Sequence, residues 1–337
     1  MSSRIEVFTI TSQVLADNPL GDPAVRRLPV YLPPGYDDTQ RRYPVIWMLA
    51  GFTGRGQMLL NDNLWTPTIQ QQLDALIAAG MPPVIMALPD CTTRYGGSQY
   101  INSAATGRYA DHLIEELVPL VDAHLRTLPA ARHRAVMGKS SGGYGALVHA
   151  MRRPDVFSAV ACHSGDMYFE YCYQPDFPKF LNRIARNNND PAAFFEEFLA
   201  RKKKSGADFA ALNVLAMAAC YSPNPAAPGL PIDFPFDLRT GELRPEVWTR
   251  WLEHDPVRLV ERYADNLRRL RLIFFDCGTR DEYHLHYGAR ILAERLRALG
   301  IAFEHEEFDD DHRGTWYRYD VSLPKLAAAI SPEGAEQ

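Results

Sequence analysis

Apolar and polar positions follow two different rhythms along the chain, which predict strands and helices in turn. Residues 5–10 and 27–33 alternate with period two and are separated by a segment rich in Pro and Gly, which predicts two antiparallel strands. Residues 44–50 are almost entirely apolar, as expected for a strand that is buried on both faces of a parallel sheet.

Strand and helix patterns alternate from there onwards. Apolar residues at helical spacing predict helices over residues 65–79 and 109–128, with a buried strand at 82–89 between them. Further strands are predicted at residues 134–139, 157–162, 272–276 and 302–308, and a helix follows each of the last two. This alternation predicts an α/β fold with a mostly parallel central sheet and helices on both faces.

The alternation is interrupted between residues 165 and 270. This stretch is aromatic and Pro-rich, and it contains helical patterns at residues 191–204 and 209–219. We therefore predict a single domain over residues 1–337 with a helical insertion at 165–270. Insertions at the carboxyl ends of parallel strands face the ligand crevice. We expect a partial cap over the active site, the alternative being an excursion remote from it.

The pattern G-x-S-x-G occurs at residues 138–142, between a predicted strand and a predicted helix. It predicts a nucleophile elbow, a sharp turn that exposes Ser140 and needs glycines where side chains would clash. A plain tight turn without chemistry is the alternative. A phosphate-binding loop is disfavoured because His133 stands five places before Gly138, where that loop needs a glycine.

A serine hydroxyl is a weak nucleophile and needs a base and an acid that orients the base. The expected chain order is serine, acid, histidine. His312 lies between the predicted strand at 302–308 and the final helix, so we predict it as the general base. Of the other candidates, His305 lies inside that strand, and His284 and His286 begin the preceding helix.

The acid is expected in the loop after the strand at 272–276. Asp281 lies in this loop, from which its carboxylate can reach the histidine nitrogen that faces away from the serine. Glu282 and Asp276 are the alternatives. We predict Asp281 as the third member of the triad.

The oxyanion of acyl transfer needs two backbone amides aimed at it. We predict the amides of Ser141, which follows the nucleophile, and of Phe52, in the loop after the strand at 44–50. Thr53 is the alternative to Phe52.

Composition limits the classes of partner. The formal net charge is −5 and the chain shows no basic excess, which argues against nucleic acid and anionic membranes and favours a small-molecule substrate. No metal or other cofactor is expected, because the acidic run at 309–311 is interpreted as a solvated loop. The oligomeric state stays open, a homo-oligomer included.

The N-terminal segment lacks a signal-peptide pattern, and no run of about 18 apolar residues occurs. The five cysteines show no regular spacing, which is typical of free thiols in a reducing compartment. We therefore expect a cytoplasmic protein.

Taken together, these motifs resemble the putative esterase family of α/β-hydrolases, which includes esterase D, feruloyl and acetylxylan esterases, enterochelin esterase-like enzymes and mycolyltransferases. The resemblance spans most of the chain and rests on residues 30–36, 100–109, 138–142, 153–157 and 312–316. It implies an α/β-hydrolase fold and a serine carboxylesterase that hydrolyses small acyl esters through a Ser-His-Asp triad and an acyl-enzyme. An acyltransferase on the same fold and a non-catalytic protein that uses the pocket for binding are the alternatives.

Two positions depart from the family pattern. Ala50 stands where the family often has His before Gly51, and Lys139 stands where it commonly has His before the nucleophile. Lys139 places a cation beside the elbow, which would favour an anionic substrate or form an ion pair with an acid of the insertion. The long insertion is unlike the compact esterase D core, which argues against formylglutathione as the substrate.

Overall fold

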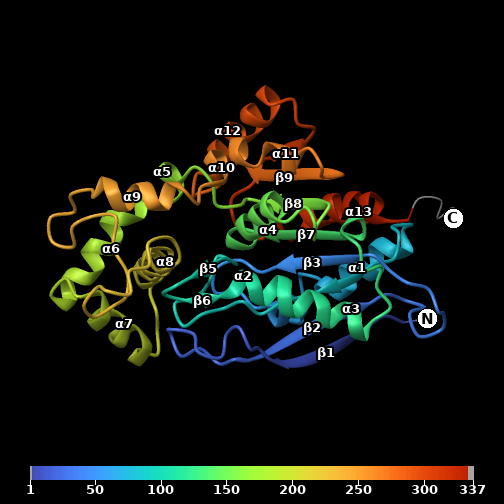
Figure 1. Ribbon diagram of the computed structural model, residues 1–337, viewed down its shortest axis with the longest axis horizontal. Coiled ribbons are helices and arrows are strands. Elements are labelled where there is room, and N and C mark those ends of the chain that lie inside the picture. Colours follow the sequence, from blue (N-terminus) through green and yellow to red (C-terminus); the bar gives the residue numbers. More distant parts are fainter. Residues whose placement is uncertain (1, 333–337) are drawn as a thin grey trace.

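Within residues 2–332, which the computed structural model describes, eight strands form one sheet and a pair of short strands forms a second (Figure 1). The order in the large sheet is β1-β2-β4-β3-β7-β8-β9-β10. β2 pairs antiparallel with both β1 and β4, and the remaining neighbours are parallel. The strands of this sheet are β1 Arg4–Thr11, β2 Val25–Leu32, β3 Val45–Leu49, β4 Ile85–Ala87, β7 Arg134–Lys139, β8 Ala159–His163, β9 Leu272–Gly278 and β10 Glu304–Phe308.

This architecture confirms the predicted α/β-hydrolase fold, including the antiparallel pair that precedes the parallel strands. The apolar run that predicted a central strand forms β3, which is fully buried because helices cover both of its faces. One face of the sheet packs against α1 (Ile69–Ala78) and α13 (Tyr319–Ile330). The other packs against α3 (Val118–His124), α4 (Ser141–Arg152) and α12 (Leu285–Ala298).

Two predicted helices differ from the structure at their ends. The helix predicted from residue 65 begins at Ile69, because the Thr68 hydroxyl and the Gln71 side chain form a reciprocal capping box there. Trp65 lies outside the helix and is 84% exposed. The helix predicted over 109–128 is interrupted by a π-helical segment, His112–Leu117, and ends at His124.

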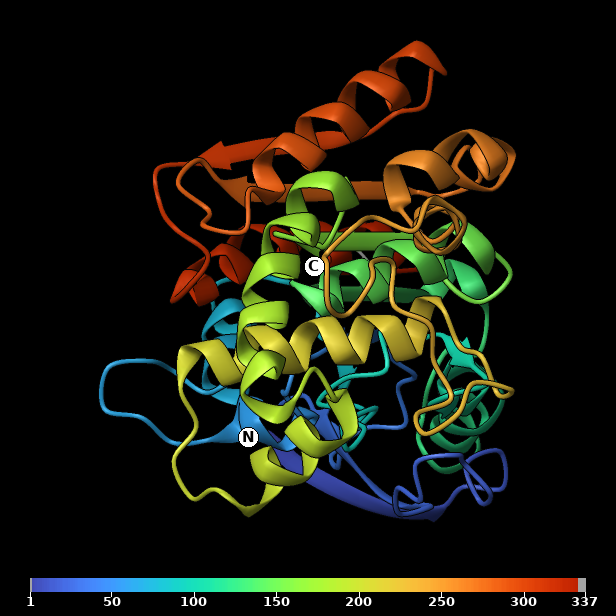
Figure 2. The same cartoon turned by 90° about the vertical axis from the view of Figure 1, so that its left-hand side faces the viewer.

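The interruption between β8 and β9 is helical. It contains the two helices expected from the sequence, α7 (Pro191–Ala200) and α8 (Gly206–Tyr221), together with others that the sequence pattern did not predict. These are α5 Phe169–Cys172, α6 Phe177–Ile184, α9 Pro245–Leu252, α10 Pro256–Arg262 and α11 Ala264–Leu267. Helices α6 to α9 gather at one end of the sheet, and viewed from that end they lie in front of the strands (Figures 1 and 2).

The insertion and the sheet share one hydrophobic core. Phe169, Phe180 and Trp251 of the insertion are completely buried and belong to the same cluster as Trp47 of β3 and Leu147 of α4. The pairs Phe177–Trp251 and Phe180–Phe234 bring aromatic rings within 6 Å of each other in that core. The insertion therefore packs as part of the structure that holds the sheet.

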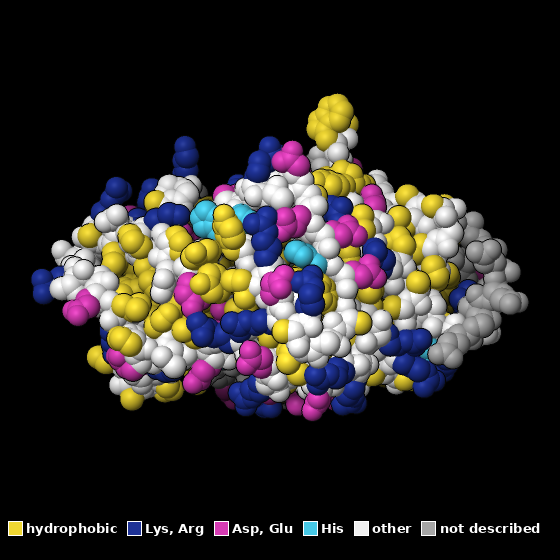
Figure 3. Space-filling view, turned by 90° about the horizontal axis from the view of Figure 1, so that it is seen from above, with side chains coloured by type: hydrophobic (Ala, Val, Ile, Leu, Met, Phe, Trp, Pro, Cys, Tyr) yellow, Lys and Arg dark blue, Asp and Glu magenta, His cyan; other side chains and the backbone are white. Residues whose placement is uncertain are grey.

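Charges of both signs are mixed on the surface. Figure 3 shows Lys and Arg side chains interspersed with Asp and Glu over the face in view. In the part of the chain that the structure describes, no helix has the length and apolar character needed to span a membrane. All five cysteines are buried as free thiols.

Candidate active site

Ser140 lies on the turn that joins β7 to α4. Its backbone has φ 57° and ψ −127°, a conformation that is strained for a residue with a side chain. The Ser140 amide donates to the carbonyl of His163 at 2.9 Å, and the Ser140 carbonyl accepts from the Tyr144 amide at 2.9 Å. The turn is thus fastened to β8 on one side and to the first turn of α4 on the other.

The two glycines of the elbow are needed because of close backbone contacts. A Cβ atom on Gly138 would lie 2.4 Å from the carbonyl carbon of Gly142, and one on Gly142 would lie 2.1 Å from the carbonyl oxygen of Leu49. Neither neighbour is a flexible side chain, so neither can move aside. The pattern that predicted the elbow from sequence therefore has a steric cause in this structure.

His312 is placed by the loop after β10 and is hydrogen-bonded to Asp281, in the loop after β9. The distance from His312 Nδ1 to Asp281 Oδ2 is 2.7 Å, and Asp281 is only 2% exposed. Burial opposes ionisation of Asp281, but hydrogen bonds from His312 and from the Tyr283 amide outweigh it and lower the pKa of the carboxyl. The ring of Tyr283 packs edge-on against His312, with the ring centres 4.8 Å apart.

The two loops are aligned by direct backbone contact. The Thr279 amide donates to the Phe308 carbonyl at 2.9 Å, and the Arg280 amide donates to the Asp310 carbonyl at 3.0 Å. Gly278 permits this approach, because a Cβ there would lie 2.3 Å from the Asp310 carbonyl oxygen. Parallel pairing of β9 and β10 thus continues beyond the strands and brings Asp281 to His312.

The two alternative acids have other partners. Glu282 accepts the backbone amide of His312 at 3.0 Å. Asp276 of β9 is buried, and its two oxygens accept hydrogen bonds from His163 Nδ1 at 2.7 Å and Arg318 Nε at 2.8 Å. Of the three carboxylates considered from the sequence, Asp281 is the one that the structure places against the imidazole of His312.

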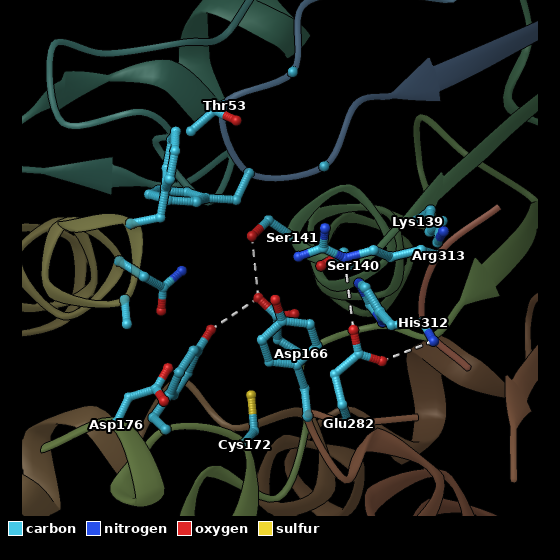
Figure 4. Close-up of a pocket in the computed structure, with 18 of the residues that line it drawn as sticks. Thr53, Lys139, Ser140, Ser141, Asp166, Cys172, Asp176, Glu282, His312 and Arg313 are labelled. Carbon is cyan, nitrogen blue, oxygen red and sulfur yellow. Dashed lines mark hydrogen bonds and ion pairs between the residues drawn. The ribbon is translucent and has the colours of Figure 1, made fainter. Parts of the chain in front are cut away.

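Ser140 and His312 line the same cavity, which has a volume of about 1300 Å³ (Figure 4). Among the described residues no hydrogen bond joins the Ser140 hydroxyl to the imidazole, and such contacts often tighten only when substrate binds. The cavity is also lined by residues 50–55 of the loop after β3 and by parts of the insertion within residues 166–186 and 206–213.

Ser141 and Phe52, whose amides are predicted to bind the oxyanion, both line this cavity. Ser141 is the first residue of α4, so its amide has no carbonyl partner within the helix. The amides of Ser141 and Phe52 have no recorded hydrogen-bond acceptor in the described part of the chain. The loop that carries Phe52 is held by the Tyr100 hydroxyl, which donates to the Ala50 carbonyl at 2.7 Å.

Lys139 also lines the cavity. Burial lowers the pKa of its ammonium, and the carboxylates that oppose this shift include Asp281, Asp311 and Glu282. None of these three carboxylates belongs to the insertion, the part of the chain in which the sequence suggested an ion-pair partner for Lys139.

Sequence reasoning missed a second hydrogen-bonded set of serine, histidine and aspartate, between the sheet and α13. His163 Nε2 lies 2.8 Å from the Ser322 hydroxyl, while its Nδ1 bonds Asp276. Ser322 is completely buried and His163 is 2% exposed, so substrate cannot reach this set. Because the His163 carbonyl also accepts the Ser140 amide, the hydrogen bonds that hold His163 also help to hold the elbow.

Sequence reasoning also missed Asp166, which lines the cavity and accepts a hydrogen bond from the Ser141 hydroxyl at 3.1 Å. The available signal was its position three residues after the end of β8, where side chains at the carboxyl end of a parallel strand face the ligand crevice. No group of three or more His, Cys, Asp or Glu side chains suited to a metal ion occurs among the residues that the structure describes.

Comparisons with known proteins agree with this architecture. A curated relative from Xylanibacter ruminicola, an endo-1,4-beta-xylanase/feruloyl esterase, is 30% identical over 165 residues, which cover 45% of this chain and 21% of the relative. The chain thus spans well under two thirds of that protein.

Solved structures match over nearly the whole chain. A ferulic acid esterase is 19% identical with a TM-score of 0.62, covering 97% of this chain and 99% of that one. An S-formylglutathione hydrolase from Agrobacterium tumefaciens is 16% identical with a TM-score of 0.59, covering 98% and 96%. At these identities the likeness shows the fold. The model of the family described as "Putative esterase" matches residues 24–325, and the chain therefore belongs to this family of α/β-hydrolases.

Proposed function

We propose that this protein is a serine carboxylesterase that hydrolyses small acyl esters through an acyl-enzyme on Ser140. The observation that carries the proposal is the strained turn that presents Ser140 to the same cavity as His312, whose other ring nitrogen is bonded to the buried Asp281. A nucleophile, a base and a group that orients the base are the minimum set for this chemistry.

In the acylation step, His312 Nε2 takes the proton of the Ser140 hydroxyl as the oxygen attacks the ester carbonyl carbon. The low pKa of Asp281 keeps its carboxylate ionised, so that it fixes the Nδ1–H tautomer and stabilises the imidazolium that forms. The amides of Ser141 and Phe52 donate to the developing oxyanion. Collapse of the intermediate breaks the ester C–O bond, and the imidazolium gives its proton to the leaving alcohol.

Deacylation repeats these steps with water as the nucleophile. His312 takes a proton from water, the hydroxide attacks the acyl carbon, and Ser140 leaves with the proton returned by the imidazolium. Apart from the ester and water, every group that acts in this scheme belongs to the chain.

We propose that the insertion at 165–270 is a partial cap on this site. Residues of α5, α6 and α8, including Cys172, Arg183 and Phe209, line the same cavity as Ser140. A wall of this kind limits the water around the acyl group and sets which acyl groups fit.

The test is hydrolysis of p-nitrophenyl acetate by the purified chain and by Ser140→Ala. We expect the variant to lose several orders of magnitude in kcat/KM while its circular dichroism spectrum is unchanged. In addition, paraoxon should transfer its diethylphosphoryl group to the wild type with release of p-nitrophenol, and intact mass should show no adduct on Ser140→Ala. Near wild-type turnover by Ser140→Ala would disprove the mechanism.

The same assay separates hydrolysis from acyl transfer. With an added alcohol acceptor, an esterase releases mainly the free acid, whereas an acyltransferase forms the new ester. Chromatographic analysis of the two products decides between them.

A further inference from the structure

The cavity contains a buried carboxylate that the proposed mechanism does not use. Asp166 is 5% exposed, and its Oδ2 atom accepts three hydrogen bonds. The donors are Gln99 Nε2 at 3.0 Å, the Tyr173 hydroxyl at 2.9 Å and the Ser141 hydroxyl at 3.1 Å. Figure 4 shows Asp166 beside Ser141, with His312 on the other side of Ser140.

The supporting residues are themselves held firmly. Gln99 is completely buried, has φ 51°, and also donates to the Tyr221 hydroxyl at 3.0 Å. Tyr173 and Tyr221 belong to the insertion and lie within the aromatic core, with ring centres 6.0 Å apart. The Asp166 carboxylate is thus fixed from both the sheet side and the insertion side.

The second oxygen of Asp166 has no such partner. Within residues 2–332 no hydrogen bond reaches Oδ1. This atom is not fully enclosed by the protein either. Because Asp166 lines the cavity, Oδ1 is in contact with the space that substrate would fill. Burial raises the pKa of Asp166, and the bonds from Gln99, Tyr173 and Ser141, which favour the ionised form, offset only part of that rise.

A half-satisfied carboxylate beside a nucleophile is suited to one kind of ligand. Its free oxygen can accept a hydrogen bond from the substrate. When ionised, the carboxylate repels the negative oxygen that the Ser141 amide binds in the transition state, unless a donor on the substrate offsets that charge. A leaving alcohol must lie toward His312, which protonates it, so the group that reaches Asp166 belongs to the acyl side.

We infer that Asp166 is a specificity-determining residue that binds a hydroxyl or ammonium group on the acyl chain of the substrate. This inference rests on the proposed function and names the substrate class: esters of hydroxy or amino acids. The apolar part of the acyl chain would lie against the insertion, and Asp166 would select the polar substituent.

The test compares pairs of p-nitrophenyl esters with the same shape. Two pairs test a hydroxyl group: 3-hydroxybutyrate against 3-methylbutyrate, and 2-hydroxypropanoate against 2-methylpropanoate. One pair tests an ammonium group: 3-aminopropanoate against butanoate. We expect wild-type kcat/KM to favour a donor-bearing ester over its isostere. In Asp166→Asn this preference should fall roughly 10- to 100-fold, the range for a hydrogen bond to a charged group.

Asp176→Asn is the matched control, because Asp176 lines the same cavity but is paired with Lys179 at 2.7 Å. Its preference should equal that of the wild type. Which pair shows the larger preference tells whether the ligand is a hydroxyl or an ammonium group.

Three results would overturn the inference. Equal wild-type rates within every pair would show that Asp166 does not select a donor. An equal loss on both members of a pair in Asp166→Asn would show a structural role only. If the wild type hydrolysed none of these esters, nor p-nitrophenyl acetate, the proposed function would fail and the inference with it; normal hydrolysis without preference would leave the proposed function intact.

Discussion

At the residue scale, the carboxylates around His312 differ in what they already bind. Asp281 is bonded to the imidazole, Glu282 to the backbone of the same residue, and Asp276 to His163 and Arg318 under the sheet. A carboxylate that satisfies other donors cannot orient the imidazole without breaking those bonds. The assignment of the acid therefore follows from hydrogen-bond partners, which a sequence does not contain.

This assignment predicts different outcomes for two conservative substitutions. Asp281→Asn keeps an oxygen near His312 Nδ1 but removes the charge that stabilises the imidazolium, so kcat/KM for p-nitrophenyl acetate should fall about 10³- to 10⁴-fold. Glu282→Gln keeps an oxygen that accepts the His312 amide and should have a small effect. The reverse order of effects would identify Glu282 as the acid.

At the scale of elements, the elbow depends on the close approach of β3, β7 and α4. Their backbones meet at Gly142, which contacts the end of β3 through the carbonyl oxygens of Leu49 and Ala50. Any side chain there must push β3 away from α4, and the loop that carries Phe52 begins where β3 ends.

Gly142→Ala should therefore destabilise the protein and remove activity together. A Cβ atom 2.1 Å from the Leu49 oxygen forces a backbone shift, for which we expect a loss of about 3 kcal/mol or more in the free energy of unfolding. Urea denaturation measures this loss. Gly206→Ala is the control for stability, because a Cβ there meets nothing within 4 Å; equal stability of the two variants would contradict the steric account.

Much of the sheet could be predicted from the sequence because its strands are buried on both faces and read as apolar runs. Residues 134–139 form β7 over the predicted range, and the positions after predicted strands hold the triad candidates Ser140, Asp281 and His312. The cap at Thr68 was missed because the helical pattern of apolar residues extends beyond it. Asp166 was missed because its environment is made by Gln99 and Tyr173, which are distant in sequence.

At the scale of the whole molecule, the insertion is joined to the sheet by a shared core, and its own helices are linked by buried ion pairs. Asp208 of α8 is 1% exposed and accepts from Arg183 Nε of α6 at 2.7 Å and from the Ser205 amide at 2.7 Å. Burial opposes ionisation of Asp208, but these bonds outweigh it and lower its pKa to about 2. The unfolded value is about 3.9.

Asp208→Asn should lower the urea concentration at the midpoint of unfolding. The unfolding should remain one cooperative transition, with the same midpoint by far-UV circular dichroism and by tryptophan fluorescence. A depressed folded pKa stabilises the native state above the unfolded pKa and ceases to do so as pH falls through the folded value. The loss should thus be about 2 kcal/mol at pH 7 and should shrink as pH falls from about 4 towards 2.

Asp265→Asn is the control for this prediction, because Asp265 also pairs with an arginine, Arg268, but its side chain is 97% exposed. It should change stability little at any pH. A separate, earlier transition in Asp208→Asn would show that the insertion unfolds independently of the sheet.

The insertion lies between His163, the last residue of β8, and Leu272, the first residue of β9, and these two strands are adjacent and parallel. Its length can therefore change without altering the register of the strands that carry the proposed triad. Because the insertion shares its core with the sheet, a segment of another length must still fill the contacts that Phe169, Phe180 and Trp251 make there. A different segment grafted between β8 and β9 would replace Asp166 and Tyr173 as well, because both lie between these strands, so the graft must bring its own groups for the acyl chain.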